Sequence, residues 1–201
     1  MNKNEKTRRL TGISILTGMV IALQIISNYI TIGSVSITLS LIPIVIGAII
    51  FGPLWGAFLG FINGIIVLFA PSTLSLFFSL HPFPTILICL TKTTIAGLLS
   101  GYIYLLFKKR DKLGAIFASI SVPIINTALF CVGALIFFND LLSSFINEGW
   151  PNIYAVLFIG FVGINFIIEF LVNFLLSGAV YTIIEFEKNK IKERTKIGED
   201  N

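Results

Sequence analysis

The stretch LIPIVIGAIIFGPLWGAFLGFINGII, residues 41–66, decides how this chain folds. It carries no charged residue, and its apolar run is interrupted near the middle by Gly52 and Pro53. Proline lacks a backbone N–H, and glycine accepts turn conformations that other residues avoid, so this pair ends one helix and begins the next. We therefore expect two consecutive apolar helices, at 38–52 and 53–71.

The rest of the chain has the same apolar character. Of its 201 residues 56% are hydrophobic and only 12% are charged, and the mean hydropathy is +0.96. A soluble domain has about 25% charged residues, whereas one membrane-spanning helix needs about 20 apolar residues. The sequence predicts an all-α membrane protein, a bundle of six transmembrane helices at 10–28, 38–52, 53–71, 83–107, 113–138 and 153–185.

The positions of the basic residues test this predicted transmembrane topology. Of the 14 Lys and Arg side chains, 13 fall before the first helix, between the fourth and fifth, or after the sixth. The positive-inside rule makes that side cytoplasmic. We therefore expect a multi-pass protein of the cell membrane with a cytoplasmic tail at 1–9, a membrane domain at 10–186 and a charged cytoplasmic tail at 187–201. The net charge of +4 reflects this topology and contact with the lipid bilayer, not nucleic acid.

The three loops on the opposite side are rich in structure-forming residues. Residues 28–38, NYITIGSVSIT, are β-branched and predict a small hairpin or lid. Residues 70–84 are apolar and broken by prolines, and residues 139–152 carry Trp150, a candidate interface anchor. The basic N-terminus is followed by no convincing cleavage site, so we expect helix one to be retained.

One lysine lies apart from these clusters, inside the apolar stretch ILICLTKTTIAGLL at 86–99. Lys92 is about ten residues into helix four, which places it roughly 15 Å along the helix axis. A charge near the bilayer centre costs about 2.5–3.5 kcal/mol on insertion scales. Lys92 should therefore face a cavity or a partner.

Helix six offers the partner in INFIIEFLVNF, residues 164–174. Asn165, Glu169 and Asn173 are spaced i, i+4, i+8, which puts them on one helical face. Asn126 and Thr127 on helix five, with Asn63 on helix three, extend the polar character. A polar stripe on apolar helices indicates a bundle interior or a cavity.

Two interpretations of this stripe stay open, and both can hold together. In the first, Lys92 and Glu169 form an internal ion pair and the asparagines bridge helices. In the second, these groups line an outward-facing site for a polar small molecule. A third class of protein, a self-sufficient secondary transporter, would use Lys92 and Glu169 as a proton- or ion-coupling pair.

Small residues form two further patterns. Gly52, Gly56, Gly60 and Gly64 repeat every four residues, a ridge that allows close helix approach and favours packing within the monomer. Ser14, Gly18 and Ala22 repeat in the same way on helix one, where no other polar feature is expected. That face can meet either its own bundle or another protein.

Sequence signatures of catalysis were not found. The chain has no GxxxxGK[ST], HExxH or GxSxG motif. Its single histidine, His81, lies in a loop between prolines, and Cys89 and Cys131 lie in apolar runs as expected for inert core thiols. We expect no enzyme activity, no cofactor and no metal site.

The opening stretch and LTKTTIAGLLSGYIY, residues 90–104, resemble the substrate-binding S components of energy-coupling factor (ECF) vitamin transporters. The resemblance covers residues 8–186. It implies a protein without ATPase activity that captures a vitamin outside the cell and works with a membrane T component and two cytoplasmic ATP-binding subunits. Their ATP hydrolysis is thought to topple the S component and carry the vitamin inward.

The resemblance also implies where the parts of the site lie. The ligand would sit in the outward half of helices four to six, beneath lids at 28–38 and 70–84, near Lys92, Asn126, Asn165, Glu169 and Asn173. Helix one of the family docks to the T component through an Ala-x-x-x-Ala pattern. The matching face here is Ser14, Gly18 and Ala22, which keeps the small size but not the identity.

The pattern is most similar to the pantothenate type. A lysine at membrane depth suits a small carboxylate, and asparagines suit hydroxyl and amide groups. The deep site offers Phe rings and no Trp near Lys92, which favours pantothenate over large flat ligands such as riboflavin. Another vitamin such as riboflavin or folate remains the alternative.

Overall fold

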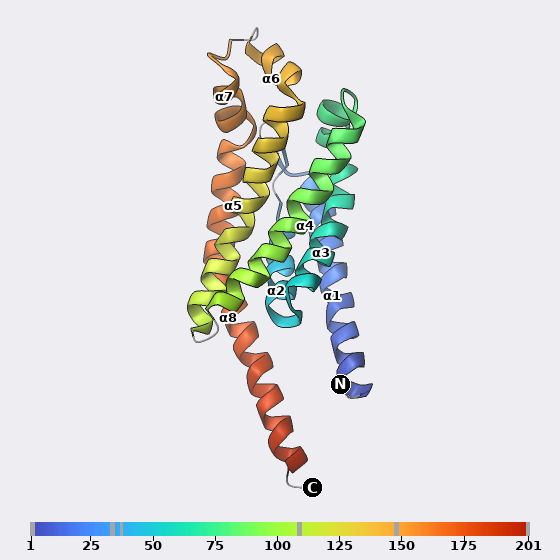
Figure 1. The fold of residues 1–201 in the computed structure, drawn as a ribbon, viewed down its shortest axis with the longest axis vertical. Coiled ribbons are helices and arrows are strands. Elements are labelled where there is room, and N and C mark those ends of the chain that lie inside the picture. The colour runs from blue at the N-terminus through green and yellow to red at the C-terminus, as the bar shows by residue number, and fades with distance from the viewer. Residues whose placement is uncertain (1–2, 33–34, 37, 108–109, 147–148, 200–201) are drawn as a thin grey trace.

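The computed structural model describes residues 3–32, 35–36, 38–107, 110–146 and 149–199, and helices make up nearly all of it (Figure 1). In chain order, the elements are α1 (Lys3–Asn28), β1 (Thr31–Ile32), β2 (Val35–Ser36), α2 (Leu41–Phe51), α3 (Pro53–Leu68), the π-helical turn η1 (Thr73–Phe78), α4 (Pro82–Leu106), α5 (Asp111–Phe137), α6 (Asn139–Ile146), α7 (Ile153–Ala155), the π-helical turn η2 (Val156–Phe161) and α8 (Gly163–Glu199).

The two chain ends lie at one end of the bundle, the lower end in Figure 1, where α4 also leads into α5. The opposite end carries η1 and α6, and we call it the loop end. The predicted order of helices also places both termini and the connection between helices four and five at one end of the bundle. The terminal helices are longer than expected, because α1 already begins at Lys3 and α8 continues to Glu199.

Four helices in the described part of the chain are long and apolar enough to span a membrane: α1, α4, α5 and α8. The other two apolar helices are shorter, with 11 residues in α2 and 16 in α3. At 1.5 Å per residue they are roughly 16 and 24 Å long, less than the ~30 Å hydrocarbon layer. The chain is a multi-pass membrane protein in which α2 and α3 are short.

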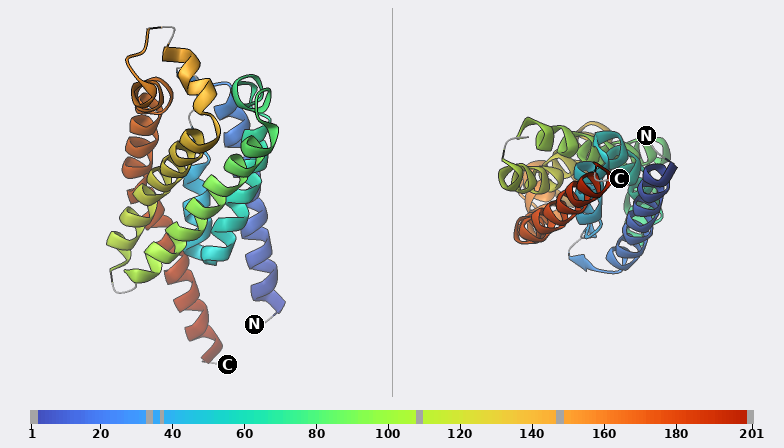
Figure 2. Two further views of the ribbon diagram at one scale, coloured as in Figure 1. Left: turned by 45° about the horizontal axis from the view of Figure 1, so that its top comes forward. Right: turned by 90° about the horizontal axis from the view of Figure 1, so that it is seen from below.

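The break between α2 and α3 falls at the predicted residues. Gly52 has φ +104°, a backbone conformation that favours glycine, and Pro53 occupies the first turn of α3. Seven of the 11 residues of α2 are buried, and the view from below in Figure 2 shows this helix enclosed by its neighbours. A helix apolar on all sides is stable only in such a position.

The glycine ridge of α3 packs against the backbone of α4. A Cβ at Gly56 would lie 2.5 Å from the carbonyl oxygen of Gly97, and one at Gly64 would lie 2.5 Å from that of Cys89. Between them, the Thr93 hydroxyl donates a 2.6 Å hydrogen bond to the Gly60 carbonyl. The prediction that this ridge packs within the monomer is confirmed.

The expected hairpin in 28–38 is also present. β1 and β2 pair antiparallel, with Thr31 opposite Ser36 and Ile32 opposite Val35, while 33–34 and 37 lie outside the described residues. The other two loops contain helical segments that were not predicted, η1 within 70–84 and α6 within 139–152.

A buried polar network fixes the chain just after the hairpin. The Ser40 hydroxyl lies 2.8 Å from Gln24 Oε1 and 2.5 Å from Asn63 Oδ1, within hydrogen-bond distance of both. The Ser27 hydroxyl accepts a 3.1 Å hydrogen bond from the Leu39 N–H. The expectation that helix one has no polar feature besides its small-residue face is therefore wrong, because Gln24 and Ser27 are fully buried on its inner face.

Candidate functional site

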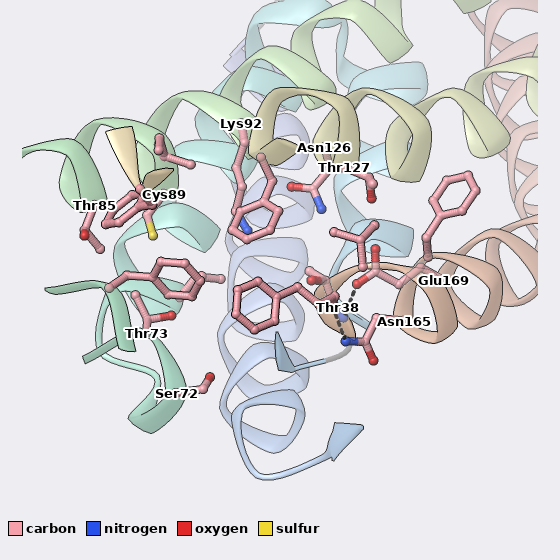
Figure 3. Close-up of a pocket in the computed structure, with 18 residues that line it drawn as sticks. Thr38, Ser72, Thr73, Thr85, Cys89, Lys92, Asn126, Thr127, Asn165 and Glu169 are labelled. Carbon is pink, nitrogen blue, oxygen red and sulfur yellow. Dashed lines mark hydrogen bonds between the residues drawn. The ribbon is translucent and has the colours of Figure 1, made fainter. Parts of the chain in front are cut away.

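A cavity of about 750 Å³, including its opening, lies toward the loop end among η1, α4, α5, η2 and α8. Its wall is polar on several sides. Figure 3 labels the polar and sulfur-bearing lining residues Thr38, Ser72, Thr73, Thr85, Cys89, Lys92, Asn126, Thr127, Asn165 and Glu169. The cavity lies in the half of α4, α5 and α8 nearer the loop end.

Lys92 is buried in α4, with 8% of its surface exposed, and its side chain lines the cavity (Figure 3). Its Nζ lies 5.3 Å from the centroid of the Phe130 ring on α5, within the range of a cation–π contact. A ring face attracts the charge but accepts hydrogen bonds poorly. The ammonium group therefore retains its capacity to donate to a ligand.

Glu169 enters the cavity from α8 and is 5% exposed. Its Oε1 accepts a 2.6 Å hydrogen bond from the backbone N–H of Thr38, the residue that joins the hairpin to α2. Among the described residues, no nitrogen of Lys92 comes within 4.0 Å of a carboxylate oxygen. The ion pair between Lys92 and Glu169, the first of the two interpretations of the polar stripe, is therefore not formed.

The three asparagines differ in position. Asn126 and Asn165 line the cavity, and the Asn126 Oδ1 is buried without a hydrogen-bond partner among the described residues. Asn165 donates a 3.3 Å bond to the Phe161 carbonyl. Asn173 shares the buried face of Asn165 and Glu169, as the spacing predicted, but lies outside the lining and donates a 2.8 Å bond to the Glu169 carbonyl.

Phenylalanines form the apolar part of the wall. Phe77 of η1 meets Phe130, Phe138 and Phe161 edge to face, with ring centroids 5.7, 5.1 and 6.1 Å apart. Edge-to-face pairs hold rings in fixed orientations. Phe166 completes this side of the lining. These rings, together with Ser72 and Thr73, show that 70–84 contributes to the cavity wall.

Comparison with known proteins identifies the family of this chain. The chain matches the model of the ECF transporter substrate-specific component over residues 13–184. It belongs to this family. No curated protein and no solved structure matched the chain. The resemblance seen in the sequence is confirmed at the level of the family, whose members are substrate-binding components of transporters and not enzymes.

This S component also presents the small-residue face predicted on helix one. Ser14, Gly18 and Ala22 are all exposed, and a Cβ at Gly18 would meet nothing within 4 Å. The glycines of α3 differ, since the backbone of α4 already covers them. Gly18 is therefore open to close approach by another helix.

Proposed function

We propose that this S component captures a water-soluble vitamin, with pantothenate as the best candidate, in the cavity around Lys92. The observation that carries the proposal is a buried ammonium group with no hydrogen bond and no ion pair among the described residues, in a cavity lined by polar and aromatic side chains. A buried cation without an anionic partner is costly. A carboxylate from the ligand supplies that partner.

The cavity wall matches the other groups of such a ligand. Asn126 and Asn165 can each donate and accept hydrogen bonds to hydroxyl and amide groups. The phenylalanines around Phe77 cover the apolar part of the molecule. Because little water competes in this environment, each polar contact is stronger than in solution.

The cavity opens to the outside if the basic end of the bundle is cytoplasmic, as the positive-inside rule requires. In this arrangement the chain crosses the cell membrane six times, with both termini inside. The segments 28–38 and 70–84 would then act as lids, a role supported by the presence of Thr38, Ser72 and Thr73 in the cavity lining.

Uptake then requires partners that supply energy. We propose that α1 docks through Ser14, Gly18 and Ala22 to a membrane T component, which associates with two cytoplasmic ATP-binding subunits. The open space at Gly18 supports this assignment, because close helix contact needs a face without large side chains.

A thermal-shift screen of the purified chain against water-soluble vitamins tests the proposal. A ligand that binds only the folded state stabilises it by RT ln(1 + [L]/Kd), about 4 kcal/mol at a thousandfold excess over Kd. We expect a large shift with pantothenate. A shift with riboflavin or folate alone would replace the vitamin but keep the function, whereas no shift with any vitamin would contradict it.

The rival class is tested in vesicles. A stand-alone secondary transporter would carry its substrate without ATP and without partner subunits. We expect the purified chain alone to bind pantothenate in vesicles but not to accumulate it in response to a proton or ion gradient. Gradient-driven accumulation by the chain alone would contradict the role of an S component.

A further inference from the structure

Two side chains of opposite charge line the cavity without pairing with each other. Lys92 and Glu169 are 8% and 5% exposed, so neither is well solvated. Among the described residues, no ion pair joins them. An ion pair between these side chains would neutralise both charges inside the protein. Because the two groups are held apart, each can take a partner from the ligand.

The two groups lack opposite kinds of partner. A lysine ammonium donates three hydrogen bonds and accepts none, and the neighbour found for Nζ is the Phe130 ring. An ionised carboxylate only accepts. Glu169 Oε1 accepts a hydrogen bond from the backbone N–H of Thr38, and a carboxylate with two oxygens can accept more than this one.

A third polar group of the cavity lining, Asn126, is bifunctional. In the view of Figure 3, Asn126 lies between Lys92 and Glu169. Its side chain is 4% exposed, and its Oδ1 is buried without a partner among the described residues. An amide both donates and accepts. It therefore complements a ligand amide, which does the same.

We infer that the cavity selects a two-ended ligand, with an anionic group at Lys92 and hydroxyl or ammonium donors at Glu169, and that these two residues fix its orientation. The inference rests on the proposed function, since it assumes that the vitamin occupies this cavity. A purely cationic ligand meets repulsion at Lys92. An anion without donors leaves the Glu169 carboxylate unsatisfied, which is costly for a buried charge.

Analogues of pantothenate separate the two ends without any mutation. Panthenol replaces the carboxylate by a hydroxymethyl group, and 3,3-dimethylbutanoyl-β-alanine keeps the carboxylate and the amide but lacks both hydroxyls. Binding of all three compounds is measured by calorimetry to the wild type and to Lys92→Gln and Glu169→Gln. Glutamine at 169 keeps an acceptor for the Thr38 N–H, so it removes charge while preserving that contact.

The expected result is a pairing of each ligand end with one residue. Panthenol should bind the wild type at least tenfold more weakly than pantothenate, and this penalty should fall below threefold in Lys92→Gln but persist in Glu169→Gln. The dideoxy analogue should show the reverse pattern. Asn173→Ala, on the same face of α8 but outside the lining, should leave both penalties unchanged.

Three results would overturn the inference. The first is equal penalties in all variants, which would leave vitamin capture intact but show that neither residue contacts its assigned end. The second is tight binding of a cation such as thiamine in place of pantothenate, which would keep the transporter function. The third, no binding of any vitamin to the folded wild type, would remove the proposed function as well. If a variant fails to fold, the wild-type affinities for the three compounds still decide, because equal affinities contradict a two-ended site.

Discussion

The backbone N–H of Thr38 donates a 2.6 Å hydrogen bond to the carboxylate of Glu169, across 131 residues of sequence. This bond joins the end of the hairpin to the helix that forms one wall of the cavity. Both partners line the cavity. One buried hydrogen bond therefore connects the segment that follows the hairpin to the wall of the cavity.

Removing this contact should open the site. A hydrogen bond to a charged group contributes about 1.5–3 kcal/mol, and about 1.4 kcal/mol is tenfold in affinity. Thr38→Pro, which lacks the donor, should weaken pantothenate binding about tenfold or more and speed its dissociation. Thr38→Ala keeps the N–H and should bind within about threefold of the wild type. Equal effects of the two substitutions on the dissociation constant would show that the N–H does not hold the lid.

Two glycines provide a matched pair for the docking face. Gly60→Leu should lower the unfolding temperature, because the new side chain meets the backbone of α4 at Thr93, and overpacking costs about 1–3 kcal/mol or more. Gly18→Leu enters open space and should leave both unfolding and pantothenate binding unchanged. It should nevertheless reduce co-purification with the T component. Loss of vitamin binding by Gly18→Leu with intact assembly would refute the docking assignment.

Ser40 lies outside the cavity lining and should be a structural residue. Ser40→Ala removes the hydroxyl that lies between Gln24 and Asn63, and buried groups left without a partner cost about 1–3 kcal/mol each. We expect a lower unfolding temperature and a weaker hold on the hairpin. Ser75→Ala, at an exposed hydroxyl of η1, is the control, and an equal change in both variants would argue against the network.

A second contact at the loop end depends on pH. His81 Nε2 and Asp140 Oδ2 lie 2.8 Å apart, and this hydrogen bond lowers the pKa of the Asp140 carboxyl. A depressed carboxyl pKa stabilises the fold above the ordinary Asp pKa of about 3.9, and the contribution is lost as the pH falls through the lowered value. The unfolding temperature of the wild type should therefore exceed that of Asp140→Asn at pH 6, and the difference should shrink as the pH falls below the ordinary Asp pKa of about 3.9. A difference that persists unchanged at pH 3 would contradict this.

Local chemistry made much of the fold predictable. Gly52 and Pro53 ended one helix and began the next because glycine adopts a positive φ that other residues avoid, and proline lacks the N–H that would continue the first helix. The fourfold spacing of Gly56, Gly60 and Gly64 indicated close packing, and α4 supplies the partner. The β-branched run around Gly33 indicated the hairpin that β1 and β2 form.

Features that depend on contacts distant in sequence were not predictable. Nothing in the spacing of α1 shows that Gln24 meets Ser40, because that pairing depends on how the chain returns after the hairpin. The same return brings the Thr38 N–H to Glu169, so that the carboxylate has a donor other than Lys92.

The prediction from helical spacing alone also extended the candidate site too far along the last helix. Asn173 shares a face with Asn165 and Glu169, but eight residues of helix advance about 12 Å, which carries it beyond the cavity lining. The π-helical turns η1 and η2 had no signal that the sequence analysis recognised. The other four named residues, Lys92, Asn126, Asn165 and Glu169, line one cavity.

The central claim is that Lys92 binds the anionic group of a vitamin in this cavity. The most direct test is calorimetric titration of pantothenate into the purified wild type and Lys92→Ala, with the unfolding temperature of each empty protein as the measure of folding. We predict at least tenfold weaker binding by a folded Lys92→Ala. Equal dissociation constants for the two folded proteins would show that the lysine is structural and would contradict the account.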